Sequence, residues 1–193
     1  MISIYEPLSL NRLCNIVSSQ SVIWNRKFYD VGTFEIHLSS SNEYQEFIKK
    51  GNIIVHGQNA GIILCASKSK SDIKIIGYDL KGVCSQRIVV PPFVYSESPT
   101  TLEGYDRIKG NAETVMKHYV DTQLVNPTDT DRKIQNLVIS SDLKLGISMA
   151  WQAKFTPLSE ELRKIGLYAG IGYDITFDEQ AKELIFDVET GID

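Results

Sequence analysis

Histidine and cysteine are the residues whose spacing in this chain could most readily build a metal or redox site, and there are three of each. They are His37, His56, His118, Cys14, Cys65 and Cys84. Their intervals match no zinc motif, and no Cys-x-x-Cys pair is present. We therefore expect no metal, no cofactor and no disulfide framework.

Carboxylate pairs and glycine-rich strings offer two further kinds of chemistry. Asp30 with Glu35, and Asp178 with Glu179, lie at predicted turns, where turn and surface roles are favoured over an acid/base pair. The GLYAGIG string at 166–172 ends a predicted helix and lacks a following Lys-Ser/Thr, so it is no phosphate-binding loop. No Gly-x-Ser-x-Gly elbow occurs. The sequence predicts no catalytic residues and a protein that is not an enzyme.

The segment 21–38, SVIWNRKFYDVGTFEIHL, is typical of a β-hairpin. One face of its first strand is predicted to carry Val22, Trp24, Arg26 and Phe28, and one face of the return strand Phe34, Ile36 and Leu38. The turn is predicted at 29–32, where an Asp can bond its own backbone and a Gly can take positive φ.

Arg26 stands among aromatic residues in this pattern, where a charge is costly unless it is paired. Glu35 is a possible partner, although period-two counting places it on the opposite face unless the turn shifts the register. We expect the aromatic residues of the hairpin to be core or interface anchors. The candidate interface or structural residues are Trp24, Arg26, Phe28, Asp30, Gly32, Phe34 and Glu35.

The remaining patterns alternate between strand and helix periods, with strands mostly in adjacent hairpins. Strands are predicted at 2–6, 52–56, 61–67, 72–77, 87–90, 136–140, 149–155, 172–177 and 184–188. Helices are predicted at 43–50 after an Asn42 cap, as a short turn after Asp79, at 112–125 after Asn111, and after a Thr156 cap to Ala169. Residues 8–20 are predicted to be a loop and 91–101 a linker. This order predicts an α+β fold, with an antiparallel barrel-like sheet at 1–95 and a mixed helix/strand lobe at 96–193.

Bulk properties exclude several classes of protein. The chain has 193 residues and a formal net charge of −4, which argues against a specific nucleic-acid binder. The N-terminal residues lack the pattern of a signal peptide, and no apolar run is long enough to span a membrane. We expect synthesis in the cytoplasm and release by lysis or within a particle.

The hairpin motif W-x-R-x-F-x-D-x-G-x-F-E, at residues 24–35, resembles the opening hairpin of siphophage and prophage tail-hub proteins, also called baseplate hub or tail-associated proteins. Later segments resemble the same family in the same order. They are IIGYDL at 75–80, QRIV at 86–89, the helix that starts NAE at 111–113 and leaves through VNP at 125–127, residues 158–167, and DVETGID at 187–193.

This resemblance implies a virion structural protein that forms a homotrimeric ring at the tip of the tail tube, with tube domains that are β-barrels. It implies contact with a distal tail protein and with a spike, fibre or hydrolase, and a channel that passes DNA. A mildly acidic channel wall would let DNA slide. Family members usually continue beyond this point, so we expect a chain shortened at its C-terminus. The alternatives are a receptor- or carbohydrate-binding module of the tail tip and, less favoured, a cell-wall hydrolase.

Overall fold

The computed structural model describes residues 1–41, 43–92 and 104–191, which fall into two compact units. The first unit consists of 1–27, 31–82 and 175–184, and the second consists of 28–30, 83–174 and the residues from 185 onward. Each unit therefore uses segments that are far apart in the chain. The domain boundary expected near residue 95 lies outside the described residues and stays a prediction.

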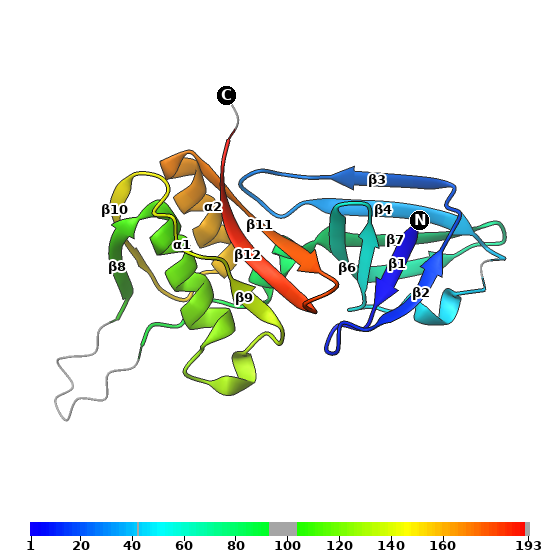
Figure 1. The fold of residues 1–193 in the computed structure, drawn as a ribbon, viewed down its shortest axis with the longest axis horizontal. Coiled ribbons are helices and arrows are strands. Elements are labelled where there is room, and N and C mark those ends of the chain that lie inside the picture. Colours follow the sequence, from blue (N-terminus) through cyan, green and yellow to red (C-terminus); the bar gives the residue numbers. More distant parts are fainter. Residues whose placement is uncertain (42, 93–103, 192–193) are drawn as a thin grey trace. The chain divides into compact units, whose positions relative to one another are not determined.

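The first unit is built on a seven-stranded antiparallel sheet with the order β2-β1-β5-β6-β7-β4-β3 (Figure 1). The strands are β1 (Ile2–Tyr5), β2 (Arg12–Ile16), β3 (Ser21–Asn25), β4 (Thr33–Ser39), β5 (Ile53–His56), β6 (Asn59–Lys68) and β7 (Asp72–Asp79). The expected barrel is wrong for the described chain, because β2 and β3 end the sheet and each pairs with one neighbouring strand. The prediction of antiparallel sheet in an α+β fold is confirmed.

Side-chain alternation explains why these segments form strands. In β7 every second residue is buried, including Ile73 and Ile75, and these pack in a core with isoleucines from β1, β4 and β5. The core also explains two glycines, one on β6 and one on β7, that lie under the same aromatic ring. A Cβ atom on Gly77 would lie 2.4 Å from Phe34 Cζ, and one on Gly61 would lie 2.7 Å from Phe34 Cε1. The Phe34 ring therefore lies directly over backbone that has no side chain.

Two predictions for the first unit differ from the structure. The segment predicted as a loop at 8–20 contains β2, whose alternate residues Cys14 and Ile16 are buried. The helix predicted at 43–50 is a single 3₁₀ turn, Gln45–Phe47, and its expected cap Asn42 lies outside the described residues. The turn predicted after Asp79 is present as the 3₁₀ segment Leu80–Gln86.

The second unit combines two helices with two small sheets (Figure 1). β8 (Asp106–Asn111) and β10 (Ser148–Ala153) form a two-stranded ribbon, and β11 (Ile171–Asp178), β12 (Glu183–Thr190) and β9 (Leu137–Ile139) form a sheet with the order β11-β12-β9. The helices are α1 (Ala112–Val120) and α2 (Leu158–Ala169). A π-helical turn, Asp121–Val125, extends α1, and Thr130–Arg132 forms a 3₁₀ turn.

Helix α1 follows its predicted stripe closely, because every member of the stripe is fully buried. These residues are Ala112, Val115, Met116, Tyr119, Val120 and Leu124. The C-terminal end of α1 is held to the start of β8, where the Tyr119 hydroxyl donates to the Asp106 carbonyl oxygen over 2.9 Å and His118 Nε2 lies 2.8 Å from Asp106 Oδ1. His118 is therefore partly buried against β8.

Three other predictions for the second unit need correction. β8 lies in a region where no strand was expected. Residues 87–90 form an extended segment with one isolated bridge, between Ile88 and Pro157, instead of a strand. The cap of α2 is Pro157 instead of Thr156. At the other end of α2 the expected stop is confirmed, since Gly170 takes a left-handed conformation with φ of 71°.

Candidate interaction surface

The predicted hairpin forms, and its aromatic pair belongs to the core of the first unit. Trp24 on β3 is directly opposite Phe34 on β4, and their rings stack with centroids 4.6 Å apart. Phe34 is only 3% exposed, whereas Trp24 is partly exposed. Phe34 is thus a structural residue of this chain, and Trp24 keeps a solvent-accessible surface beside the sheet edge.

The tip of the hairpin, Phe28–Asp30, belongs to the second unit. A Cβ atom on Gly172 would lie 2.6 Å from the Phe28 ring, so Phe28 packs directly on the backbone of β11. Tyr29 packs against Phe28 edge to face, with ring centroids 4.8 Å apart. Asp30 Oδ2 lies 3.7 Å from Arg163 Nε on α2, and both side chains are about half exposed. Phe28 and Asp30 therefore have local packing roles in addition to the predicted interface role, which stays a prediction.

Gly32 is required for space and not for its backbone conformation. Its φ lies outside the left-handed region, contrary to the expectation of positive φ. A Cβ atom here would lie 2.4 Å from the carbonyl oxygen of Asn25 and 2.5 Å from Asp79 Oδ2. The Gly32 N–H donates to Asp79 Oδ2 over 2.8 Å, and this carboxylate is buried. The hairpin is thereby fixed to the end of β7.

Glu35 belongs to a charged network on the outer face of β4 and β7. Its Oε1 lies 2.8 Å from His37 Nε2, and its Oε2 lies 2.8 Å from Lys74 Nζ. His37 Nδ1 lies 2.8 Å from Asp72 Oδ2. The hydrogen bonds to Glu35 and Asp72 raise the pKa of His37, and those from His37 and Lys74 lower the pKa of Glu35.

Glu35 pairs with His37 and Lys74, and Arg26 lies elsewhere in the hairpin. Arg26 lies beyond the end of β3 and is exposed, and the register of the hairpin puts Ile23 opposite Glu35. Arg26 is exposed, and the other six predicted residues divide into a core pair, a tip in the second unit, a close backbone contact and a surface network. The sequence signal for the network was absent, because its four members come together only through the register of β4 with β7.

The open edge of the sheet at β3 is the part of this region most suited to binding a partner. β3 is hydrogen-bonded on one side to β4, and among the described residues no strand pairs with its other side. Ile23 at its centre is 58% exposed, and Val17 between β2 and β3 is 83% exposed. An edge strand with apolar side chains is a template for strand addition from another chain.

The second unit contains a buried ionic cluster that sequence reasoning missed. Lys117 Nζ lies 2.6 Å from Glu113 Oε1 and 3.3 Å from Asp187 Oδ1, and it also donates to the Ser140 hydroxyl and the Ser141 carbonyl oxygen. Glu113 is fully buried and Lys117 is 7% exposed. Although burial opposes it, the hydrogen bond from Ser140 lowers the pKa of Asp187. The i,i+4 spacing on α1 is the one sequence signal that could have indicated this pair.

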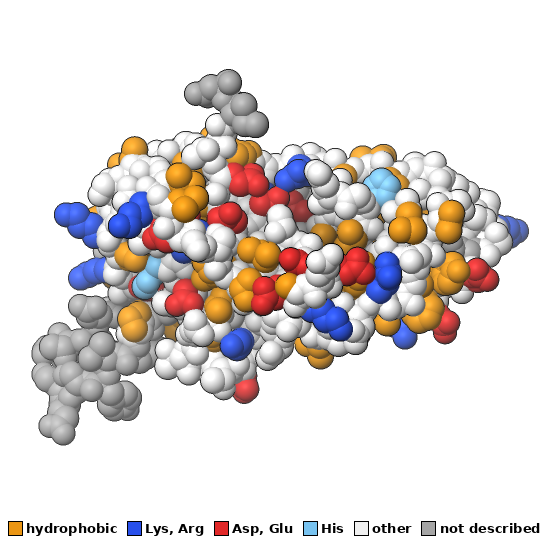
Figure 2. All heavy atoms as spheres, viewed as in Figure 1, with side chains coloured by type: hydrophobic (Ala, Val, Ile, Leu, Met, Phe, Trp, Pro, Cys, Tyr) orange, Lys and Arg blue, Asp and Glu red, His pale blue; other side chains and the backbone are white. Residues whose placement is uncertain are grey.

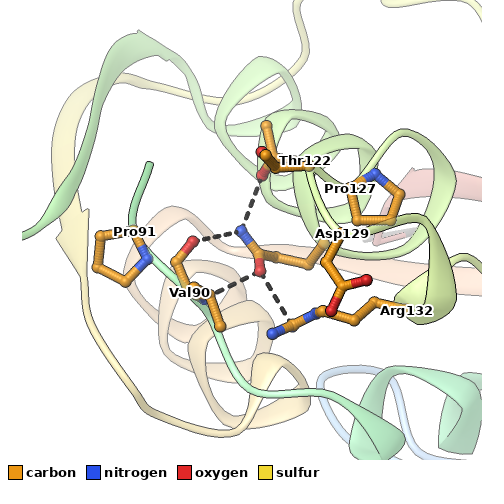
Figure 3. A pocket seen from close by; sticks show the side chains of 8 residues that line it. Val90, Pro91, Thr122, Pro127, Asp129 and Arg132 are labelled. Carbon is orange, nitrogen blue, oxygen red and sulfur yellow. Dashed lines mark hydrogen bonds between the residues drawn. The ribbon is translucent and has the colours of Figure 1, made fainter. Parts of the chain in front are cut away.

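A pocket of about 310 Å³ lies between the extended segment 88–91 and the end of α1 (Figure 3). The Gln123 amide makes two hydrogen bonds with the Val90 backbone. Its Oε1 accepts from the Val90 N–H over 2.9 Å, and its Nε2 donates to the Val90 carbonyl oxygen over 3.1 Å. Arg132 Nη2 donates to the carbonyl oxygen of Ile88 over 2.7 Å. Pro91 and Pro127 form apolar walls. These bonds add to the backbone hydrogen bonds between residues 87–89 and 155–158, so the polar groups here support the fold.

In residues 1–41, 43–92 and 104–191, no group of three or more His, Cys, Asp or Glu side chains is arranged to hold a metal ion. None of the helices described is long and apolar enough to cross a membrane.

A family model described as "Siphovirus ReqiPepy6 Gp37-like protein" matches residues 1–193, which is the whole chain. The chain belongs to this family. No curated protein matches it in sequence. The relationship of this siphovirus Gp37-like chain to other proteins is therefore visible mainly in the fold.

The prophage tail protein gp18 from Listeria monocytogenes EGD-e has a similar structure, with a TM-score of 0.58 and 8% identity. The match covers 96% of the Gp37-like chain and 49% of the Listeria protein. At this identity the likeness shows a shared fold.

Two further structures are more distant, with TM-scores of 0.48 and 0.42. The Escherichia coli c3393 protein, a component of the type VI secretion system, is 6% identical, and the match covers 89% of this chain and 48% of that one. The 43 kDa tail protein of prophage MuSo2 from Shewanella oneidensis is 13% identical, with 96% and 54% covered. The Gp37-like chain thus spans about half the length of these three proteins.

Proposed function

We propose that this chain is a structural protein of a bacteriophage or prophage tail tip. In this role it is a tail-hub or baseplate ring protein that joins the tail tube to the distal tail parts, it resides in the virion tail, and it does no catalysis. The observation that carries the proposal is the match of the whole chain to a siphovirus family, together with the fold shared with a Listeria prophage tail protein at a TM-score of 0.58.

The open seven-stranded sheet supports an assembling role. Its two edge strands, β2 and β3, each pair with one neighbour within the described chain. An uncovered edge is a liability for a protein that stays alone in solution, and a ring of identical copies or a bound tail protein would cover it. The proposed partners are two further copies in a homotrimer, a distal tail protein, and a spike, fibre or hydrolase.

Labelling of intact virions tests this function directly. Gold-conjugated antibodies raised against the 193-residue chain are expected to mark the tail tip of phage particles from the strain that encodes it, as seen by electron microscopy. Antibodies preadsorbed with the purified chain are the control. Label that stays in the lysate and never sediments with particles would refute a virion role, and label on the capsid would refute the tail-tip position.

A receptor- or carbohydrate-binding module is the second candidate, because exposed aromatic rings are present in the second unit. Tyr168 on α2 is 65% exposed, and its ring centroid lies 6.2 Å from that of Trp151. Rings of this kind can pack on sugars. Retention of the chain by purified cell walls, lost in Tyr168→Ala but not in Tyr29→Phe, would favour this candidate, and release of soluble wall fragments during the same incubation would overturn the proposed absence of catalysis.

A further inference from the structure

The β8–β10 ribbon presents a basic face that the described chain leaves uncovered. Arg107 and Lys109 on β8 alternate with more buried residues, and Ala150 and Gln152 face the same way on β10. All four side chains are exposed. Together with Ile108 and Trp151 they line a groove of about 580 Å³ along the ribbon. In Figure 2, Lys and Arg side chains gather at the end of the second unit that holds β8 and β10.

Aromatic rings hold the cations of this face in place. Lys154 Nζ lies 5.4 Å from the ring centroid of Tyr105 and 5.5 Å from that of Phe155, and the Arg107 guanidinium carbon lies 5.9 Å from the Tyr105 ring. Tyr105 is 40% exposed and Phe155 is 53% exposed. None of the ion pairs among the described residues includes Arg107, Lys109 or Lys154. Within the described part of the chain, no carboxylate therefore neutralises these three cations.

The net negative charge of the chain makes a second copy of it a suitable partner for the basic ribbon. The sequence has 20 Lys and Arg residues and 24 Asp and Glu residues. Without the three cations of the ribbon, 17 basic residues remain against 24 acidic ones, so the rest of the chain is distinctly acidic. Complementary charge steers association and suppresses wrong pairings. A basic ribbon on an acidic chain is thus suited to bind a second copy.

Strand β12 supplies a matching acidic face in the second unit. Asp187 and Glu189 alternate with the buried Phe186 and Val188, so their side chains point away from the core. Asp187 is about half exposed even though it contacts Lys117, and Glu189 is exposed. In extended chains, residues two apart are separated by about 6.6 Å on one face, which is the same interval as that from Arg107 to Lys109. Two cations and two carboxylates can therefore pair along the strands.

We propose that the β8–β10 ribbon of one copy binds the outward face of β12 in a second copy of this chain. The inference rests on the proposed function in one respect, because it names the contact through which copies of a tail protein assemble. The two surfaces differ, so one contact leaves a ribbon and a β12 face unused. Association of this head-to-tail kind continues from copy to copy and closes as a ring where the rotation permits.

Charge reversal on each surface tests the contact. Sedimentation velocity of the 193-residue chain over a range of concentrations gives the association constant. We expect Arg107→Glu/Lys109→Glu and Glu189→Arg each to weaken association at least tenfold, and 0.5 M NaCl to weaken that of the unaltered chain similarly. The matched control is Lys49→Glu/Lys50→Glu, which makes the same change in net charge at exposed positions of the first unit and is expected to associate as the unaltered chain does.

A mixing experiment separates a specific contact from general repulsion. A mixture of Arg107→Glu/Lys109→Glu with Glu189→Arg is expected to associate more tightly than either variant alone, because the intact ribbon of one variant meets the intact β12 face of the other. Far-ultraviolet circular dichroism must match for all chains, which shows that the loss does not come from misfolding.

Three results would overturn the inference. One is association of both reversal variants with the constant of the unaltered chain, and another is an unaltered chain that stays monomeric at every concentration. The third is binding of a fluorescent single-stranded oligonucleotide that is lost in Arg107→Glu/Lys109→Glu, because the occupant would then be nucleic acid. None of these results bears on where the protein lies in the virion. The antibody labelling therefore tests the proposed function independently of this contact.

Discussion

Replacement of Lys117 by methionine tests whether the ionic cluster of the second unit is as deeply buried as its geometry indicates. The substitution keeps the length of the side chain and removes the amine. Glu113 is fully buried, so the change leaves a carboxylate that keeps the N–H of Leu145, 2.7 Å from Oε2, and loses the ammonium 2.6 Å from Oε1. Loss of one partner from a buried ion pair costs about 3–5 kcal/mol, because the other charge remains without compensation.

The same reasoning predicts a large recovery in a double variant. Lys117→Met with Glu113→Gln removes both charges and keeps a side chain that can accept from the Leu145 N–H. Exchange of a buried pair for uncharged groups of similar size is often neutral or stabilising, so we expect most of the lost stability to return. Lys164→Met is the matched control. It removes the ammonium 2.8 Å from Glu161 Oε1, but Lys164 is 48% exposed, so its cost is expected to be below about 1 kcal/mol.

Urea unfolding followed by tryptophan fluorescence measures these changes. Trp24 belongs to the first unit and Trp151 to the second, so a Trp24→Phe background lets the signal of Trp151 report on the second unit. With a slope of about 2 kcal/mol/M, a loss of 4 kcal/mol lowers the midpoint by about 2 M. A cost of less than about 1 kcal/mol for Lys117→Met, or a double variant no more stable than the single one, would refute the buried-pair reasoning.

Three further predictions concern packing and pH. Gly172→Ala places a methyl group 2.6 Å from the Phe28 ring and is expected to lower the free energy of unfolding by about 1–3 kcal/mol, as measured with urea. A Phe28→Ala background should remove most of that cost, and equal costs in both backgrounds would contradict the contact. Phe34→Ala removes a ring that is 3% exposed and is expected to cost about 3–5 kcal/mol, whereas a cost near zero would place the ring outside the core. His37→Gln tests the surface network: because the folded state raises the pKa of His37, its stabilising effect is complete below about pH 6.5 and is lost as pH rises through the raised pKa. The difference in melting temperature between His37→Gln and the unaltered chain should therefore shrink at alkaline pH, and a difference that grows there would contradict the raised pKa of His37. The pKa of Glu35 is lowered in the folded state, so the stabilising contribution of Glu35 should fade as pH falls below about 4.5.

The parts of the fold that follow a strong local period could be predicted from the sequence. In the hairpin of β3 and β4, the return strand β4 alternates apolar and polar residues, and Val22 and Trp24 share one face of β3. Helix α1 has apolar residues at the spacing of one helical face, and all of them are buried. In both cases local pattern and burial agree, so neighbouring residues alone carry the information.

Short edge strands were missed because their residues carry little local signal. β8 reads Asp106-Arg-Ile-Lys-Gly-Asn111, which is mostly polar or charged and includes a glycine. Its strand conformation depends on β10, which lies about forty residues later in the chain, and pairs Ile108 with Trp151. Such long-range pairing overrides a weak intrinsic preference.

The local contacts of the predicted interface residues could not be read from the sequence, and neither could the exposed edge at Ile23. Gly32 was singled out for the conformational freedom of glycine, yet the structure requires it because Asp79 and Asn25 approach closely. Glu35 was matched with Arg26, yet it pairs with His37 and Lys74 through the register between β4 and β7. Contacts of this kind depend on which strands become neighbours, and sequence periodicity does not encode that.

The segment 175–184 has a consequence for synthesis of the protein. It belongs to the first unit, where Phe177 packs against the Tyr5 ring with centroids 4.7 Å apart and Glu179 lies 3.5 Å from Arg12. A ribosome makes residues 1–82 long before it makes this segment, at roughly 5–20 residues per second. The nascent N-terminal sheet must therefore wait several seconds without its last contacts. During that time its edge strands face other nascent chains on the same messenger RNA, which favours assembly of copies made side by side.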